Sequence, residues 1–182
     1  AAAAKEESIR LALIGCGGRG GGLVGTVVKN DSAVSVGWLC DINPGRTEAV
    51  ARMIGRYQST RPQRTSRYED VLADKNVDAV IIATPPQWHA LLLLAALDRE
   101  IDVYCEKPLA WSVWECRLMA DTARERKVKT QMGNQKHVDF QNHRAARLIK
   151  AGVIGTVREI HIGQPLRASE FVWPDQARID AL

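Results

Sequence analysis

The 182-residue chain has no long apolar run, no closely spaced cysteine pair and no dense block of one charge. No stretch of eighteen or more apolar residues occurs, so we expect no transmembrane helix and no membrane partner. The cysteines show neither C-x-x-C spacing nor a cluster with histidine, so we predict no disulfide and no metal site. We interpret Cys16, Cys40, Cys105 and Cys116 as small hydrophobic residues in a reducing compartment.

The charged residues, 25% of the chain with a net charge of +4, are scattered along the sequence. A weakly basic surface suits an anionic small ligand or nucleic acid. A solvated surface of mixed charge explains it better, and we expect no nucleic-acid partner. The first four residues, AAAA, have neither the basic region nor the apolar core of an export signal. The unpaired cysteines favour a cytoplasmic protein; the alternative is a periplasmic one, with these residues left by a cleaved signal.

Segments typical of strands and of helices alternate along the first 150 residues. Strands are expected at residues 9–14, 34–40, 78–83, 101–105 and 128–132, and helices at 21–30, 45–57, 68–73, 87–97, 112–126 and 142–151. Residues 78–83, DAVIIA, are the clearest strand, because strands buried on both faces are apolar throughout. This order predicts an α/β fold in which a doubly wound parallel (Rossmann) sheet carries helices on both faces.

A change of pattern near residue 151 marks the predicted domain boundary. Residues 156–162, TVREIHI, alternate apolar and polar side chains, which predicts a strand with one solvent-exposed face in a second, antiparallel (α+β) domain. We assign residues 1–150 to the doubly wound domain and residues 151–182 to the start of the second domain. About thirty residues are too few for a core of their own, so we expect this second domain to be incomplete.

A glycine-rich segment lies between the first strand and the first helix. Gly15, Gly17 and Gly20 match G-x-G-x-x-G in the strand–helix context that a dinucleotide-binding loop requires. The first glycine permits a tight turn, the second lets a diphosphate approach the backbone, and the third lets helix and strand pack closely. Gly18 and Arg19 complete the loop, and free N–H groups at the start of the helix would hold the phosphates.

Asp41 ends the second strand, about 20 residues after the last of these glycines, as expected for the acid that binds a ribose of the cofactor. A carboxylate accepts hydrogen bonds from the ribose hydroxyls of NAD and repels the 2′-phosphate of NADP. Because Arg19 and Arg46 could weaken that repulsion, we predict NAD as the cofactor and NADP as the less favoured alternative. The competing interpretation is a flexible glycine loop followed by a surface aspartate.

Two further segments, residues 84–89 (TPPQWH) and 106–108 (EKP), resemble the glucose–fructose oxidoreductase, inositol dehydrogenase and MocA family (Gfo/Idh/MocA). This family has T-P-x-x-x-H after its fourth strand and E-K-P after its fifth. Residues 130–137 (TQMGNQKH) and 151–162 (AGVIGTVREIHI) are also similar to family segments, the latter to the entry into the C-terminal substrate domain. The segments occur in the family's order and spacing, and the resemblance covers nearly all of residues 9–163.

The resemblance implies a catalytic role for Lys107, between the nicotinamide ribose and the substrate, where it would hold the reacting hydroxyl. The alternative is a structural lysine paired with Glu106, which is itself a candidate cofactor-binding residue. Thr84 and Pro85 are expected to lie along the cofactor, with the Thr84 hydroxyl bonded to a ribose or phosphate oxygen.

His89 is a candidate cofactor contact, although we favour its interpretation as an anchor for the preceding loop. Asn134 and Gln135 follow the sixth strand, where they either contact cofactor or substrate or form a turn. The family's D-x-x-x-H pair of the substrate domain has no counterpart here in the right context. Residues 139–143, DFQNH, have the spacing but lie between a strand and a helix. We therefore expect the chain to hold the cofactor half of the site and one catalytic lysine.

Three functions are compatible with these residues. The resemblance implies an NAD(P)-dependent oxidoreductase that removes hydride from a secondary alcohol of a small sugar, polyol or sugar derivative, in a homo-oligomer formed through the C-terminal domain. A second possibility is an enzyme that uses tightly bound NAD transiently in sugar elimination or hydrolysis, without net release of NADH. The third is a nucleotide-binding module without catalysis, which would bind NAD but turn over no polyol.

Overall fold

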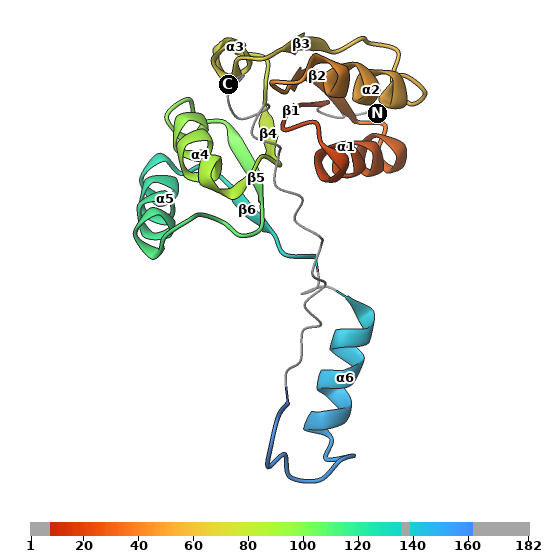
Figure 1. The fold of residues 1–182 in the computed structure, drawn as a ribbon, viewed down its shortest axis with the longest axis vertical. Helices are drawn as coiled ribbons and strands as arrows, with labels where there is room; N and C mark the ends of the chain where they lie inside the picture. Colours follow the sequence, from red (N-terminus) through yellow and green to blue (C-terminus); the bar gives the residue numbers. More distant parts are fainter. Residues whose placement is uncertain (1–7, 136–138, 162–182) are drawn as a thin grey trace, which may run out of the picture. The chain divides into compact units, whose positions relative to one another are not determined.

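The computed structural model describes residues 8–135 and 139–161 of the chain. The chain divides into two compact units, Ala1–Gln135 and Lys136–Leu182, and each is described by itself. The first unit contains a sheet with helices packed on it, and the described part of the second contains the helix α6 (Phe140–Lys150) (Figure 1). The predicted boundary at residue 150, which places this helix in the first domain, stays a prediction.

Six parallel strands form one sheet in the order β3-β2-β1-β4-β5-β6. The strands are β1 (Ile9–Ile14), β2 (Val34–Cys40), β3 (Gln63–Thr65), β4 (Ala79–Ile82), β5 (Asp102–Glu106) and β6 (Thr130–Gly133). The chain runs outward from β1 to β3, returns to the centre at β4 and continues outward to β6. The predicted doubly wound sheet is thus confirmed, and the order reverses between β1 and β4, where open α/β sheets bind ligands.

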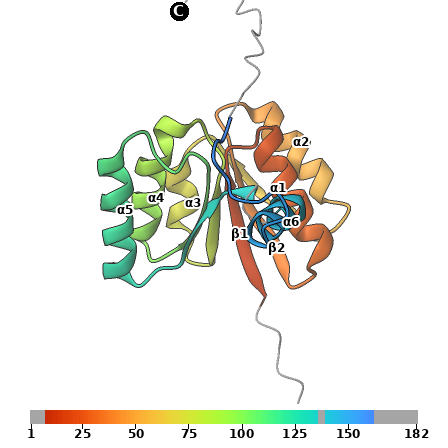
Figure 2. The ribbon, with the colours of Figure 1, turned by 90° about the horizontal axis from the view of Figure 1, so that it is seen from below.

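Helices cover both faces of the sheet (Figure 2). One face is packed by α1 (Gly18–Asn30) and α2 (Pro44–Ile54), and the other by α3 (Tyr68–Ala73), α4 (His89–Leu97) and α5 (Val113–Arg126). Because successive strand side chains point to opposite faces, Leu11 and Leu13 join the first core while Ala12 and Ile14 join the second. Burial on both faces explains why β4 is apolar throughout and why β1 is apolar from Leu11 onward.

Helix α1 begins at Gly18, three residues before the predicted start at residue 21. Glycine disfavours a helix interior, which is why the sequence pointed to a later start. Here small size outweighs that preference, since a Cβ atom at Gly21 would lie 3.2 Å from Val50 of α2 and one at Gly25 would lie 3.0 Å from Met53. The glycines therefore let α1 pack closely on α2 from its first turn.

The strand predicted at residues 156–162 is not found over residues 156–161, and residue 162 lies outside the described part. A strand exists only when its backbone is hydrogen-bonded to a neighbour, and the described residues of this unit contain no other strand to pair with it. Alternating polarity alone was therefore insufficient for this prediction. Within residues 8–135 and 139–161, no helix has the length and hydropathy needed to cross a membrane.

Candidate dinucleotide-binding site

Strand register brings the predicted site residues to one edge of the sheet. Ile14 pairs with Cys40 on one side and with Ile82 on the other, and Ile82 pairs in turn with Cys105. Each of these strands therefore ends at the same level, and the residues that follow lie next to one another. They are Gly15, Asp41, Thr84, Glu106 and Lys107, with Asn134 and Gln135 following β6.

The glycine loop has the steric features predicted from its motif. Gly15 has a φ of +97°, and a Cβ atom there would lie 2.6 Å from the carbonyl carbon of Ala83. A Cβ atom at Gly20 would lie 2.0 Å from the Gly15 carbonyl oxygen. At Gly17 and Gly18, in contrast, a Cβ atom would meet nothing within 4 Å. The first and last glycines are thus required by packing, whereas the middle pair borders open space.

That open space lies at the N-terminus of α1. Gly17 occupies the N-cap position and offers no side-chain oxygen to the first turn, which also contains no acidic residue. The N–H groups of this turn are therefore directed into the space above Gly17 and Gly18, where the helix dipole favours a negative charge. A diphosphate fits this cradle, since it needs both backbone donors and the absence of side chains.

Asp41 is held on the other side of the loop by backbone groups. Its side chain is only 5% exposed; Oδ2 accepts a hydrogen bond from the Cys16 N–H and Oδ1 from the Asn43 N–H, each at 2.8 Å. The guanidinium of Arg46 lies 4.0 Å from Oδ2. Each carboxylate oxygen has two lone pairs, so Asp41 retains acceptor capacity for ribose hydroxyls after these contacts.

The loop after β4 is anchored by His89, which is fully buried. Its Nδ1 lies 2.8 Å from the Pro108 carbonyl oxygen and its Nε2 lies 2.9 Å from the Thr84 carbonyl oxygen. His89 therefore joins the loop after β4 to the loop after β5, which is the anchoring arrangement favoured from the sequence. Pro85 is exposed on the first of these loops.

Thr84 carries an unsatisfied hydroxyl. Among the described residues, its Oγ1 is the buried side-chain oxygen or nitrogen that has no hydrogen-bond partner. A buried hydroxyl without a partner costs on the order of 1–3 kcal/mol. Its place after β4, beside Gly15 of the glycine loop, suits a hydrogen bond to an oxygen of a ligand.

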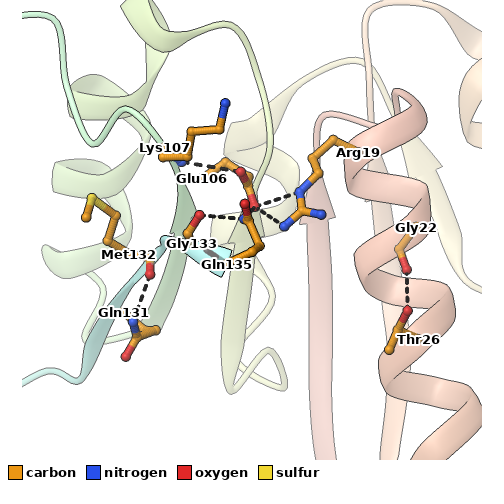
Figure 3. Close-up of polar contacts among 9 residues, drawn as sticks. All are labelled: Arg19, Gly22, Thr26, Glu106, Lys107, Gln131, Met132, Gly133 and Gln135. Atoms are coloured by element: carbon orange, nitrogen blue, oxygen red, sulfur yellow. Dashed lines mark hydrogen bonds and ion pairs between the residues drawn. The ribbon is translucent and has the colours of Figure 1, made fainter. Parts of the chain in front are cut away.

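Glu106 forms the centre of a polar cluster at the end of β5 (Figure 3). Its Oε1 accepts hydrogen bonds from Arg19 Nε at 2.8 Å and from Gln135 Nε2 at 2.7 Å, and it forms an ion pair with Arg19 Nη2 at 2.8 Å. A Cβ atom at Gly133 would lie 2.6 Å from the same oxygen, so glycine is needed there to make room. The sequence did not predict this cluster, because its members come from α1, β5 and the segment after β6.

The cluster fixes the charge of Glu106. Burial acts to raise the pKa of this carboxyl group, but the hydrogen bonds from Arg19 and Gln135 and the charge of Arg19 outweigh it and leave the pKa below its ordinary value. The hydrogen bond to Glu106 in turn raises the pKa of Arg19. Arg19 is therefore paired with Glu106. Of the two arginines expected near Asp41, Arg46 is the one that lies close to it.

Lys107 is exposed, and its side chain extends away from the Glu106 carboxylate (Figure 3). Within residues 8–135 and 139–161, its ammonium group has no ion-pair or hydrogen-bond partner. The alternative in which Lys107 is a structural partner of Glu106 is thus not what the structure shows. Asn134, also exposed, donates its backbone N–H to the Met132 carbonyl oxygen at 2.9 Å, which is a turn contact.

The cysteines lie free in the structure, as predicted. Cys16, Cys40 and Cys105 are buried, and Cys116 is half-buried. Burial, chiefly, raises the pKa of each of the three buried thiols to about 12. They are therefore protonated at neutral pH and act as packing residues. The described residues contain no group of histidine, cysteine and acidic side chains that could hold a metal ion.

A parallel sheet that reverses at β1 and β4, a glycine cradle at a helix N-terminus and an acid at the end of β2 together define a dinucleotide-binding Rossmann domain. Residues 9–134 match the family described as "Oxidoreductase family, NAD-binding Rossmann fold" (GFO_IDH_MocA). The chain belongs to this family, which confirms the resemblance seen in residues 84–89 and 106–108.

Named relatives extend this comparison. The chain is 31% identical over 150 residues to scyllo-inositol 2-dehydrogenase (NAD(+)) of Bacillus subtilis, covering 82% of this chain and 42% of that protein. It is 27% identical over 173 residues to a glycosyl hydrolase family 109 protein of Shewanella woodyi, covering 93% of this chain and 36% of that one. Among solved structures, GenD2 from gentamicin A biosynthesis in complex with NAD superposes with a TM-score of 0.72 at 26% identity, covering 81% of this chain and 40% of that chain. The chain thus spans about two-fifths of the length of these relatives.

Proposed function

We propose that the protein is an NAD-dependent oxidoreductase that acts on a secondary hydroxyl of a sugar, polyol or sugar derivative. One observation carries the proposal: the open cradle at Gly17 and Gly18, the acid Asp41 and the unpaired ammonium of Lys107 all lie at the sheet edge where the strand order reverses. The dehydrogenase relative of Bacillus subtilis supports the reaction and the class of substrate.

Each residue has a defined part in this proposal. The N–H groups around Gly15, Gly17 and Gly20 hold the diphosphate, and Asp41 accepts hydrogen bonds from the adenosine ribose. The bound nicotinamide supplies the hydride acceptor. Lys107 donates a hydrogen bond to the oxygen of the reacting hydroxyl and stabilises the negative charge that develops there as a general base takes the hydroxyl proton.

Further cofactor contacts are assigned to the loops around this centre. The Thr84 hydroxyl, with Pro85 beside it, faces the cofactor, and Glu106 Oε2 accepts from a ribose hydroxyl. We assign Asn134 and Gln135, which follow β6, to the carboxamide of the nicotinamide. His89 contributes by holding the loops in place. We also propose that the protein forms a homo-oligomer through a substrate domain and that its substrate is a small sugar or polyol.

NAD is preferred to NADP because Asp41 is a buried carboxylate already fixed by two backbone N–H groups. Its negative charge would face the 2′-phosphate of NADP at short range, and Arg46, at 4.0 Å and more than half exposed, offsets only part of that repulsion. The complex of GenD2 with NAD supports the same preference.

A second reaction is favoured by the glycosyl hydrolase family 109 relative. In that case the substrate hydroxyl is oxidised and later reduced again while the cofactor stays bound, so no NADH accumulates. The contacts of this chain with the cofactor would be the same. Steady release of NADH, followed by its absorbance, supports the dehydrogenase, whereas turnover of a glycoside without NADH release supports the hydrolase.

Gly17→Val and Gly22→Ala form a matched pair that tests the cradle. Both new side chains begin in open space, and the φ of −67° at Gly17 suits any residue, so both variants should fold like the parent chain. Only the valine would occupy the position of the diphosphate. Calorimetric titration with NAD⁺ should show binding for the parent and Gly22→Ala and none for Gly17→Val. Equal affinity of all three chains would overturn the proposal.

A further inference from the structure

Glu106 and Lys107 are neighbours of opposite charge, yet the two side chains do not pair. The carboxylate instead binds Arg19, which precedes it by 87 residues and reaches it from the first turn of α1. Oε1 receives two Arg19 nitrogens and the Gln135 amide, while Oε2 receives, among the described residues, the Lys107 backbone N–H at 3.4 Å. The acid is therefore satisfied on one oxygen by residues distant in sequence, and the described part of the chain offers the Lys107 ammonium no partner.

Burial explains why Glu106 needs a cation. Its side chain is 6% exposed, and an ionised carboxylate at such a position is strongly destabilised unless a positive charge or several donors compensate it. Arg19 meets this need with two donors directed at one oxygen, a geometry that a guanidinium provides and an ammonium does not. If Arg19 were absent, the adjacent lysine, on its flexible four-carbon stem, would be available to take its place.

We propose that Arg19 is a positioning residue that keeps the Lys107 ammonium free for the substrate by holding the Glu106 carboxylate. The role of Lys107 toward the substrate rests on the proposed function, whereas the competition between Arg19 and Lys107 for Glu106 is a property of the chain itself. An ammonium bound to Glu106 would have to leave that partner before it could bind a substrate hydroxyl. Arg19 removes this cost before any ligand arrives.

A different role for Arg19 must be separated from this one. Its side chain is 47% exposed and belongs to the first turn of α1, next to Gly17 and Gly18, so its whole role could be to attract the phosphates of the cofactor. In that case, loss of Arg19 would weaken NAD binding, and Lys107 would be unaffected in the free protein. The two roles therefore differ in a quantity that can be measured without any cofactor.

That quantity is the rate at which an acylating reagent labels Lys107, followed by peptide mass spectrometry on the chain without ligand. The variants are Arg19→Met, Glu106→Gln and the double variant, with the exposed Lys29 and Lys75 as internal references. In Arg19→Met we expect Lys107 to be labelled about threefold to fivefold more slowly than in the parent, the size of an exposed ion pair. In Glu106→Gln and in the double variant the rate should equal that of the parent.

Rescue of Lys107 labelling by the second substitution supports the competition when Lys29 and Lys75 keep the parent rate in every variant. Loss of structure caused by an uncompensated Glu106 carboxylate could also be repaired by Glu106→Gln, so the reference lysines are needed to separate the two. An unfolded variant would also be recognised, since Lys29 and Lys75 would change together with Lys107. If the reference lysines change in Arg19→Met, the variant Arg19→Lys is used instead. Its ammonium holds Glu106 with fewer donors, so Lys107 should be labelled at a rate between that of the parent and that expected when Lys107 is paired with Glu106. Adding Glu106→Gln should restore the parent rate. An unchanged Lys107 rate in the folded arginine variant, or a double variant that stays slow, would overturn the proposal.

Failure of this inference can be told apart from failure of the proposed function. Calorimetric titration of the parent chain with NAD⁺ tests the function and does not depend on Arg19. Binding of NAD⁺ together with an unchanged Lys107 rate would refute the positioning role alone. A lysine rate that follows the expected pattern without any NAD⁺ binding would refute the proposed function and leave the competition for Glu106 established.

Discussion

The two halves of the candidate site, at the carboxyl ends of β1–β2 and of β4–β6, are built in different ways. The β1–β2 side consists of glycines that leave space beside backbone N–H groups, and of the Asp41 carboxylate, which the N–H groups of Cys16 and Asn43 hold. The β4–β6 side consists of side chains from separate elements, centred on Glu106 with Arg19 and Gln135. The shape of the β1–β2 side is fixed by close steric contacts, whereas the arrangement of the β4–β6 side depends on opposite charges that compensate one another.

This difference assigns different tasks to the two sides. Backbone donors and glycine space recognise a diphosphate and a ribose, which every dinucleotide contains. A charged cluster beside an unpaired lysine is suited to proton transfer, because the state of each group depends on its neighbours. Substitutions on the β1–β2 side should therefore cause large losses of NAD⁺ affinity. Those on the β4–β6 side should cause smaller changes in stability that depend on pH.

The largest effect is expected for Gly20→Ala. Its Cβ atom would lie 2.0 Å from the Gly15 carbonyl oxygen, so the loop must move away from the strand. Overpacking of this kind costs about 1–3 kcal/mol of folding free energy and displaces the phosphate donors. Chemical denaturation should show the loss of stability, and calorimetry should show that NAD⁺ binding is abolished. Normal binding by this variant would mean that the loop is not sterically fixed.

Asp41→Asn should have the next largest effect. The amide keeps the size of the side chain, but it presents one acceptor oxygen where two backbone N–H groups now bind, and it lacks the charge. Loss of charge-assisted hydrogen bonds should reduce NAD⁺ affinity by about 2 kcal/mol, or roughly 30-fold. NADP⁺ should lose less or gain, because the repulsion of its 2′-phosphate is removed. Parallel titrations measure both, and an unchanged NAD⁺/NADP⁺ ratio would contradict the role of Asp41.

Glu106→Gln should produce a smaller effect that depends on pH. Because the folded pKa of Glu106 lies below its ordinary value of 4.5, its ionised contacts stabilise the fold above that pH. The stabilisation is lost as the pH falls through the lowered pKa. Urea denaturation should therefore show the parent more stable than the variant by about 1–2 kcal/mol at pH 7. This difference in the free energy of unfolding should decrease below pH 4.5. An increase in acid would contradict the lowered pKa of Glu106.

Gly22→Ala should have the smallest effect and the opposite sign. Gly22 lies within α1, its Cβ atom would meet nothing within 4 Å, and its carbonyl oxygen accepts a hydrogen bond from Thr26 Oγ1 at 2.9 Å (Figure 3). Alanine is favoured over glycine in a helix interior by up to about 1 kcal/mol. A small rise in the melting temperature with unchanged NAD⁺ affinity is expected. A lower melting temperature would show that a Cβ atom at Gly22 does meet neighbouring atoms.

The β1–β2 side was predictable from the sequence because its interactions are local. The strand at residues 9–14, the glycines and Asp41 follow one another at a spacing set by a single strand–helix–strand unit. The capping box that starts α5 was predictable for the same reason, since Ser112 and Glu115 are three residues apart. In each case the residues that carry the signal lie within one element or one strand–helix–strand unit.

The β4–β6 side was predictable only in part. The sequence placed Lys107 at the end of a strand, but it could not show that Glu106 binds Arg19, because side-chain pairing across 87 residues depends on strand order and register. Gly133 carries the same lesson, since its need for glycine arises from Glu106 on the neighbouring strand. Residues 156–161 show the converse, in that local polarity predicted a strand for which the described residues contain no partner.

The most direct test of dinucleotide binding at the candidate site is a titration of the isotopically labelled chain with NAD⁺, followed through its backbone amide resonances. The resonances of residues 15–20 and of Asn43 should shift and saturate together, while those of residues at the amino ends of the strands stay unchanged. Saturable shifts confined to another surface, or no shifts with a folded chain, would contradict the assignment of the site.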